Sequence, residues 1–463
     1  MTEQLKLKLN DSKATRWGAL VIVAFTMMAA YYVNDVVAPL KTMLETDLAW
    51  SSTDFGFFTG GYSFLNVFFL MLIWGGLILD RFGIRFTGKL ATILMVGGTA
   101  LEYYAMTGLA GADATLFGIN EIFGYKTGVF VAFAGYSIFG VGAEVAGITV
   151  SKIIAKWFKG KELATAMGVQ VALARIGSQA GYAVAIPLAR AFGISTPVLL
   201  GLVLLLGGMI AFFIFAVMDK KLDKQMEAAA IAAGTEDEEE KFSFKDVKNI
   251  LVYPGFWLIA LLCVLFYSCV FPFQKFASEL MIIKYGINEN VAGTFAGLPA
   301  LGALILTPVF GGFIDKRGKS ASIMLLGSAM LICVHFIYAI PDINYWLVAI
   351  VLMIILGIAF SLVPSAMWPA VAKIFPVSQL GTAYALIFFI QNIGLWGIPT
   401  LIGWVLDAYC ISGKKPDGTN MYDYTVPMCI FTGIACLSLI VALLLKKADK
   451  KYGYKLEEPN IQK

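Results

Sequence analysis

Residues 140–178 read GVGAEVAGITVSKIIAKWFKGKELATAMGVQVALARIGS, and their pattern indicates the type of fold. Two apolar segments flank a short basic turn at residues 157–162, and the first segment carries one acid, Glu144, while the second carries one base, Arg175. The two charges lie equally far from the midpoint of the turn. In an antiparallel helical hairpin that rises about 1.5 Å per residue, both therefore lie roughly 20 Å from the turn, near the middle of a bilayer about 30 Å thick.

A charged side chain at that depth costs several kcal/mol unless it is paired or faces water, which makes it a candidate functional residue. The planar guanidinium of Arg175 suits a carboxylate, and Glu144 can accept hydrogen bonds from an ammonium group. A small zwitterion would satisfy both. The competing interpretation is a permanent ion pair that locks two helices together.

The rest of the chain is equally apolar. Of its 463 residues, 59% are hydrophobic and 14% are charged, against about 25% charged in soluble proteins. Backbone polar groups in lipid must be satisfied internally, and the apolar spans lack the two-residue alternation of barrel strands, so we expect an all-α membrane protein. Twelve spans are long enough to cross a bilayer: 17–43, 55–79, 88–109, 127–155, 163–191, 196–218, 255–282, 292–314, 321–340, 345–371, 379–407 and 425–445.

The basic residues predict the orientation of these spans. With the N-terminus in the cytoplasm, most of the 35 Lys and Arg residues fall in cytoplasmic segments, as the positive-inside rule requires. Two bases, Arg175 and Lys275, lie within spans. The first 16 residues lack the pattern of a cleaved signal peptide. We therefore expect a multi-pass protein of the cell (inner) membrane with both termini in the cytoplasm.

The spans divide into two halves. We expect an N-terminal six-helix bundle at 17–218 and a C-terminal one at 255–445, with cytoplasmic tails at 1–16 and 446–463. Between the bundles lies a polar segment, 219–254, that contains a run of acidic residues. Charge runs are usually solvated, so this segment is interpreted as a cytoplasmic linker.

The halves also repeat a loop motif. GGLILDRFGIR follows span two at residues 75–85, and GGFIDKRGK follows span eight at residues 311–319. Glycines allow close helix packing, an aspartate at a helix end can pair with a base, and the basic residues suit anionic headgroups. We expect these residues to form a cytoplasmic gate motif: Asp80, Arg81, Arg85, Asp315 and Lys316.

The paired loops, the twelve spans and the central linker resemble the major facilitator superfamily, a group of transporters built from repeats. Within it the chain is similar to the branch of lysosomal dipeptide uniporters of animals. WFKGKEL at 157–163 and ARIGS at 174–178 carry this closer resemblance. Further matching residues are Tyr62-Ser63 with Asn66, Gly140-x-Gly-x-Glu144, Val270-Phe-Pro-Phe273, Trp368-Pro369, Gln379-Leu-Gly-Thr-Ala-Tyr384 and Gln391-Asn-Ile-Gly394.

The resemblance implies alternating access and facilitated diffusion of dipeptides, with Glu144 and Arg175 binding the two ends of the substrate. Asp35 is a candidate second acid near the amine, or else the cap of a helix break. Six further polar or aromatic residues are candidates to line the site, although each could instead pack in the core: Tyr62, Asn66, Tyr267, Trp368, Gln391 and Asn392.

Other chemistries have little support. The chain lacks a phosphate-binding GxxxxGK[ST] loop, and its one histidine, His335, is interpreted as a packing residue. With one His and scattered Cys residues we expect no metal or cofactor, no enzymatic reaction and no nucleic-acid partner.

Animal members of the branch work with a glycosylated partner, but the single sequon here, Asn10-Asp11-Ser12, lies on the predicted cytoplasmic tail. We therefore expect a monomer without an accessory subunit. A second transport hypothesis stays open: a proton-coupled carrier of another small organic anion, amino acid or drug, which would use Arg175 alone or a titrating Glu144.

Overall fold

The structure is a computed structural model that describes residues 8–111, 114–158, 161–233 and 244–459. The first part of the chain forms η1 (Leu9–Asp11), α1 (Lys13–Val36), η2 (Ala38–Leu40), α2 (Lys41–Asp47), α3 (Ser52–Phe68), α4 (Met71–Thr107), β1 (Glu121–Ile122), β2 (Tyr125–Lys126), α5 (Thr127–Trp157), α6 (Leu163–Phe192) and α7 (Thr196–Ala233). The second part forms α8 (Phe244–Val252), α9 (Pro254–Tyr285), α10 (Glu289–Ala296), α11 (Leu298–Arg317), α12 (Ser320–Ala339), α13 (Trp346–Ile374), α14 (Val377–Tyr409), β3 (Ile411–Lys414), β4 (Asn420–Tyr422) and α15 (Thr425–Tyr452).

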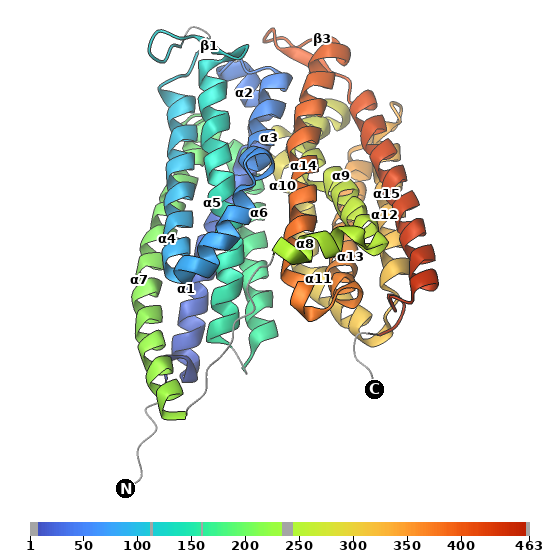
Figure 1. Ribbon diagram of the computed structural model, residues 1–463. Coiled ribbons are helices and arrows are strands. Elements are labelled where there is room, and N and C mark those ends of the chain that lie inside the picture. Colours follow the sequence, from blue (N-terminus) through green and yellow to red (C-terminus); the bar gives the residue numbers. More distant parts are fainter. Residues whose placement is uncertain (1–7, 112–113, 159–160, 234–243, 460–463) are drawn as a thin grey trace.

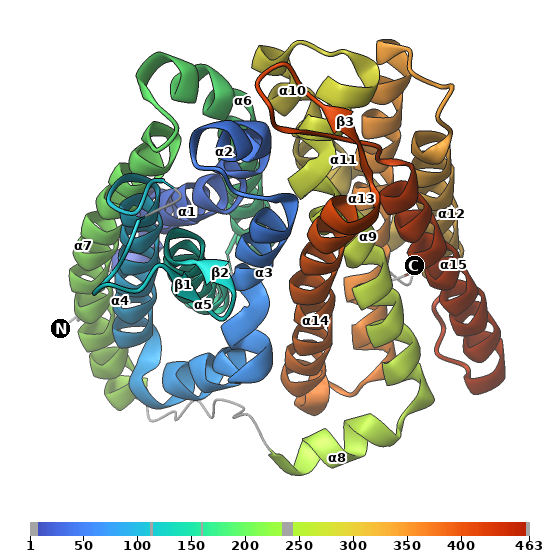
Figure 2. The same cartoon turned by 90° about the horizontal axis from the view of Figure 1, so that it is seen from above.

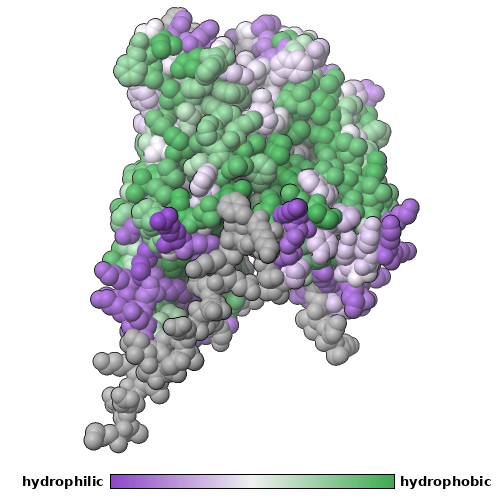
Figure 3. Space-filling model, in the orientation of Figure 1, coloured by the Kyte–Doolittle hydropathy of each residue, from purple (hydrophilic) through white to green (hydrophobic). Residues whose placement is uncertain are grey.

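The helices form two bundles side by side, α1–α7 and α9–α15, with α8 lying across the bottom of the view in Figure 2. Both antiparallel β-hairpins, β1–β2 and β3–β4, lie at one end of the molecule, which we name the hairpin end (Figure 1). The start of α1 and the close of α15 lie toward the opposite end, the tail end (Figure 1). A broad apolar band separates polar surfaces at the two ends, as expected for a membrane protein (Figure 3).

Each predicted span falls mainly on helical residues. Among the described residues, nine helices are long and apolar enough to cross a membrane, or ten if the bent pair α3–α4 counts as one span. The pair α3–α4 supplies predicted spans two and three, and α6 supplies span five. α6 is not among these nine helices, and it carries Arg175 among other polar residues. The twelve-helix, two-bundle fold is confirmed.

The boundary between spans two and three differs from the expected loop. α4 runs through it with one non-helical residue, Gly83, whose φ of 74° and ψ of 174° suit glycine. The chain also bends inside span two, by 58° between α3 and α4. The loop motif is therefore a kinked helical corner rather than an irregular loop.

The predicted end of span six is also too early. α7 continues to Ala233 rather than ending near residue 218, since the Asp, Lys, Glu and Ala residues that follow are compatible with a helix. Asp219 on this extension is fully buried, and its carboxylate accepts hydrogen bonds from Lys156 (2.7 Å) and Trp157 (2.9 Å). Part of the predicted linker is thus integral to the first bundle, whereas its acidic run at 236–240 lies outside the described residues.

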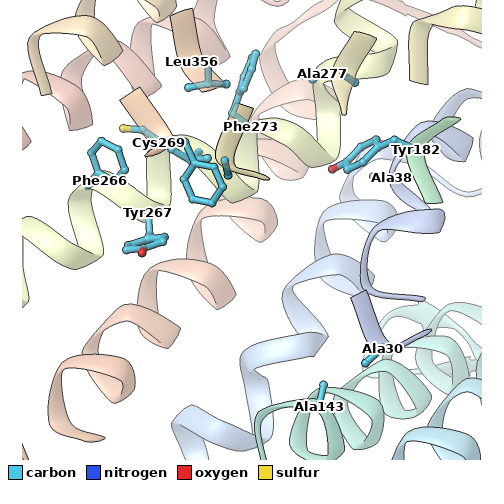
Figure 4. Packing of buried hydrophobic residues seen from close by; sticks show 14 of the residues in the cluster. Ala30, Ala38, Ala143, Tyr182, Phe266, Tyr267, Cys269, Phe273, Ala277 and Leu356 are labelled. Carbon is cyan, nitrogen blue, oxygen red and sulfur yellow. The ribbon is translucent and has the colours of Figure 1, made fainter. Parts of the chain in front are cut away.

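Small residues set the helix positions around the central charges. A Cβ on Gly140 would lie 2.0 Å from the backbone oxygen of Tyr62, and one on Gly177 would lie 2.1 Å from that of Met28. Glycine at these two positions therefore allows α5 to pack closely on α3 near Glu144, and α6 to pack closely on α1 near Arg175. Ala30 of α1 and Ala143 of α5 likewise lie near each other where these helices approach (Figure 4).

Candidate functional site

Two adjoining chambers, which share lining residues, lie between the bundles. The larger, of about 800 Å³, is lined by residues of α1, α4, α5 and α6 from the first bundle and of α13 and α14 from the second. It reaches toward the tail end, since Asp80 and Lys152 line it. The smaller, of about 160 Å³, lies deeper toward the hairpin end and is lined from α1, α3, α5, α9 and α14. Both volumes exceed what a few waters require.

Glu144 stands where the chambers meet, because it lines both of them. The hydroxyl of Tyr62, on α3, donates a hydrogen bond of 3.0 Å to its Oε1 atom. Tyr62 also lines the smaller chamber. The predicted acid therefore faces a central cavity rather than lipid, and a predicted neighbour orients it.

Arg175 lines the larger chamber and is half-buried. Its guanidinium lies 5.5 Å from the ring centroid of Tyr31 and 4.9 Å from that of Phe360, which belongs to the second bundle. Cation–π contacts of this kind hold the cation without using its hydrogen-bonding fork. Although both residues are described, no ion pair joins Glu144 to Arg175. The direct ion pair of the competing interpretation is therefore absent from this state.

Two aromatic candidates, Trp368 and Tyr267, lie one behind the other at the wall of the larger chamber. Trp368, on α13, lines the larger chamber. Its indole N–H donates a hydrogen bond of 3.3 Å to the hydroxyl of Tyr267, which is buried on α9 and lines neither chamber. Tyr267 lies on a different side of α9 from Cys269 and Phe273 (Figure 4). Trp368 can thus wall a ligand directly, and Tyr267 supports it.

Asp35 has a partner that the sequence analysis did not identify. Its Oδ1 atom lies 3.2 Å from the ammonium of Lys275 on α9, in the opposite bundle. Lys275 lines the smaller chamber, whereas Asp35 does not. The signal in the sequence was available, because Lys275 and Arg175 are the two bases that lie within predicted spans.

Three amide-bearing candidates are buried away from the chambers. Asn66 is 1% exposed and its amide atoms have no hydrogen-bond partner. Gln391 accepts a hydrogen bond from Cys263 at 3.3 Å, and Asn392 donates one of 2.9 Å to the backbone oxygen of Phe388. In this state these three residues pack within the bundles rather than facing the cavity.

The gate-motif residues lie at the tail end. Asp80 lines the larger chamber and pairs with Lys152 at 3.4 Å. Arg81 lies over the ring of Phe82. Arg85 pairs with Asp219 (3.5 Å) and Asp223 (2.5 Å) on α7.

In the second copy of the gate motif, Asp315 and Lys316 occupy the last turn of α11, half-buried and exposed respectively. His335 is fully buried between Phe273 and Phe431, with its Nε2 atom 3.0 Å from the backbone oxygen of Cys269, which fits a packing role. Within the described part of the chain, no group of three metal-ligating side chains could hold a metal ion.

Comparisons with known proteins agree on the type of molecule. The family profile described as Major Facilitator Superfamily matches residues 20–399 and 276–458. The chain is 29% identical over 454 residues to the lysosomal dipeptide transporter MFSD1 of Homo sapiens. The alignment covers 95% of this chain and 88% of that protein. Two solved structures share the fold: a D-xylose-proton symporter (TM-score 0.66, 15% identity, 93% and 97% of the chains) and the peptide transporter POT in complex with sulfate (0.67, 14%, 95% and 94%).

Proposed function

The chain belongs to the major facilitator superfamily of membrane transporters, and on that premise we propose that it carries dipeptides as a uniporter by alternating access. The observation that carries the proposal is one cavity at the centre of the fold with an acid, Glu144, and a base, Arg175, on its wall. The likeness to a lysosomal dipeptide transporter over nearly the whole chain points to the same class of substrate.

In the proposed binding mode the two charges bind opposite ends of a zwitterion. Glu144 accepts hydrogen bonds from the substrate ammonium, with Tyr62 holding the carboxylate in place. The fork of Arg175, already positioned by the rings of Tyr31 and Phe360, takes the substrate carboxylate. Because Phe360 belongs to the second bundle, a ligand on Arg175 would contact the place where the two bundles meet.

The mechanism we infer is a rocking of the two bundles about this site. In this state the larger chamber extends to the tail end, while contacts between bundles close the hairpin end. In this state a substrate would enter and leave from the tail side. Closing the tail end and opening the hairpin end would then expose the substrate to the other side of the membrane. Facilitated diffusion needs no further coupling step.

We propose that the tail end faces the cytoplasm of a cell whose inner membrane holds the protein as a monomer. The concentration of Lys and Arg in segments that the positive-inside rule assigns to the cytoplasm supports this orientation. The transport units would be residues 17–218 and 255–445, joined by 219–254, with α7 extending from the first unit into that linker.

The deciding experiment is counterflow of a labelled dipeptide in proteoliposomes made with the purified protein. We expect uptake by the wild type and a loss of at least tenfold in Glu144→Gln and Arg175→Ala, with unchanged yield and melting temperature. Dipeptide uptake that is equal in the wild type and both variants would refute the binding mode.

The same vesicles separate uniport from proton coupling. A uniporter takes up dipeptide to the same equilibrium level with and without an imposed pH gradient. Accumulation above that level, driven by the gradient and lost in Glu144→Gln, would instead support the proton-coupled carrier, since Glu144 has a phenol and no cation as its hydrogen-bond partner.

A further inference from the structure

We infer that Lys275 is a second carboxylate-binding residue, which holds the C-terminal end of the substrate in the smaller chamber. The inference rests on the proposed transport of dipeptides and adds a residue and a position to it. It assigns a ligand to a buried base that neither the repeat motifs nor the resemblance to dipeptide transporters pointed to.

The smaller chamber has the composition of a zwitterion site. One acid, Glu144, and one base, Lys275, line it, together with three tyrosines, Tyr31, Tyr62 and Tyr136. Arg175 does not line it. A substrate that keeps its ammonium on Glu144 and moves into this chamber therefore leaves Arg175 and meets Lys275 as the cation of the chamber wall.

Lys275 is held ready by groups that a carboxylate could replace. Its side chain is 10% exposed, and its ammonium donates to the backbone oxygen of Asn34 (2.6 Å), to Oδ1 of Asp35 (3.2 Å) and to the hydroxyl of Tyr136 (3.4 Å). The shortest of these bonds goes to a carbonyl near the C-terminus of α1, where a cation is favoured. The bond to the Asp35 carboxylate is longer. A substrate carboxylate in its place keeps the cation compensated, and Asp35 keeps the hydrogen bond of 2.8 Å that the side-chain amide of Asn34 donates to its Oδ1 atom.

This exchange of carboxylates at Lys275 would couple substrate binding to the movement of the bundles. Asp35 lies on α1 of the first bundle and Lys275 on α9 of the second, so their ion pair ties the bundles together between the cavity and the hairpin end. A substrate carboxylate that takes the place of Asp35 removes that tie. The loaded protein would then open its hairpin end more easily than the empty one.

The test compares uptake of a dipeptide with uptake of its C-terminal amide, which keeps the ammonium but lacks the carboxylate. We expect the wild type to prefer the acid. Lys275→Gln should lower the ratio of acid uptake to amide uptake about tenfold, the effect of about 1.4 kcal/mol of interaction lost by the acid alone. Lys275→Arg, which keeps the charge, should retain most of the preference.

A purely structural role for Lys275 would lower acid and amide uptake together, and that outcome overturns the inference. Asp35→Asn/Lys275→Gln removes both charges and guards against misfolding from an unpaired Asp35; it too should lose the acid preference, while Asp35→Asn alone should keep or increase it. If the wild type transports no dipeptide, the proposed function fails and this inference fails with it. Dipeptide transport with an unchanged acid-to-amide ratio in the Lys275 variants refutes the inference alone.

Discussion

The hairpin end of the molecule ties the two bundles together with buried charges, whereas the ion pairs seen at the tail end join residues of the same bundle. At the hairpin end Lys41 of α2 lies 2.6 Å from both Glu45 of its own helix and Glu279 of α9, and all three side chains are at most 4% exposed. Lys415, beyond β3, approaches both carboxylates at 3.9 Å. Tyr424 donates a hydrogen bond to Glu279.

Backbone contacts reinforce this closure. Asp407 of α14 accepts hydrogen bonds from the N–H groups of Ser52 (3.3 Å) and Thr53 (2.6 Å), so one bundle caps a helix of the other. A Cβ on Gly56 would lie 2.4 Å from the backbone oxygen of Pro399, and one on Gly403 would lie 2.3 Å from that of Ser52. The bundles therefore approach to backbone distance at this end.

The tail end shows another arrangement. Arg16 pairs with Glu162, Lys152 with Asp80 and Lys156 with Asp219, each within the first bundle. The larger chamber opens between the bundles at the same end. Each of these three pairs therefore joins residues of one bundle.

The comparison explains why a transporter would close one end with ions rather than with apolar side chains. A buried ion pair contributes little net stability because desolvation offsets the attraction. When the hairpin end opens, water can hydrate the separated charges, so closure and opening differ little in free energy. An apolar contact of the same area would favour closure at every stage of the cycle.

The largest effect should come from blocking the close approach at the hairpin end. Gly403→Val places a branched side chain against the backbone of Ser52, so we expect the end to stay open and dipeptide counterflow to fall at least a hundredfold. The matched control on the same helix is Gly397→Val, because nothing lies within 4 Å of its Cβ position. Equal activity in the two variants would show that close approach is not required.

The next effect contrasts one lysine from each end. Lys41→Met removes the nearer of the two cations beside the buried Glu45 and Glu279 and leaves only Lys415, at 3.9 Å. Loss of one partner of a buried pair typically destabilises by about 3–5 kcal/mol. Lys152→Met alters a pair whose side chains are about one third exposed, and such pairs contribute roughly 0–1 kcal/mol. Thermal unfolding in detergent measures both. A melting temperature that falls equally in the two variants would contradict the difference between the ends.

A smaller effect separates gating from helix capping. Asp407→Asn weakens the cap that α14 provides to α3, and Ser51→Ala removes the cap that α3 receives from its own bundle, a bond of 3.0 Å to Asp54. We expect each substitution to lower the free energy of unfolding by about 0.5–2 kcal/mol. Only Asp407→Asn should increase labelling of a cysteine introduced at the hairpin end, since only that cap crosses between bundles. Equal labelling in both variants would refute the gating role.

The smallest effect is the response of the tail end to acid. Hydrogen bonds from its own backbone N–H and then from Arg16 lower the pKa of Glu162, and bonds from Lys161 and the Lys8 backbone lower the pKa of Asp11. A lowered pKa stabilises the folded form above the ordinary values of 4.5 and 3.8, and this contribution is lost as the pH falls through the folded values.

We therefore expect the segment around η1 to loosen below about pH 4. The measurement is the fluorescence of Trp17, which packs on Phe158, as the difference between wild type and Trp17→Phe. Glu162 with Arg16 and Asp11 with Lys161 are pairs within one bundle. Cysteine labelling at the hairpin end should therefore stay constant as these acids are protonated. A labelling change that follows the Trp17 signal would show that the two ends are coupled through these groups.

Much of the fold was accessible to sequence analysis because its signals are local. Apolar spans, the repeated loop motif and the position of Glu144 depend on residues close together in the chain. The predicted span boundaries were less accurate in two places. The polar extension of α7 is helical although it has no apolar pattern, and a single glycine, Gly83, forms the corner where a loop was expected.

The candidate site divides in the same way. Equal distances from one turn predicted that Glu144 and Arg175 lie at one depth, and the structure places both on one cavity. Asn66, Gln391 and Asn392 are of suitable types in suitable spans, but the rotation of their helices directs them into the bundles. A residue on a helix turns by about 100° per position, so a span boundary uncertain by two residues leaves its direction undetermined.

Local patterns along the chain were enough to predict many membrane crossings in two related halves, with opposite charges near the centre. Those results follow from hydrogen-bond satisfaction in lipid and from the fixed rise of a helix. Three other features became visible only in three dimensions: Lys275 meets Asp35, Glu144 and Arg175 share a cavity without touching, and the hairpin end is the closed one. Each of these depends on how two rigid bundles are placed against each other, and no local pattern along the chain specifies that angle.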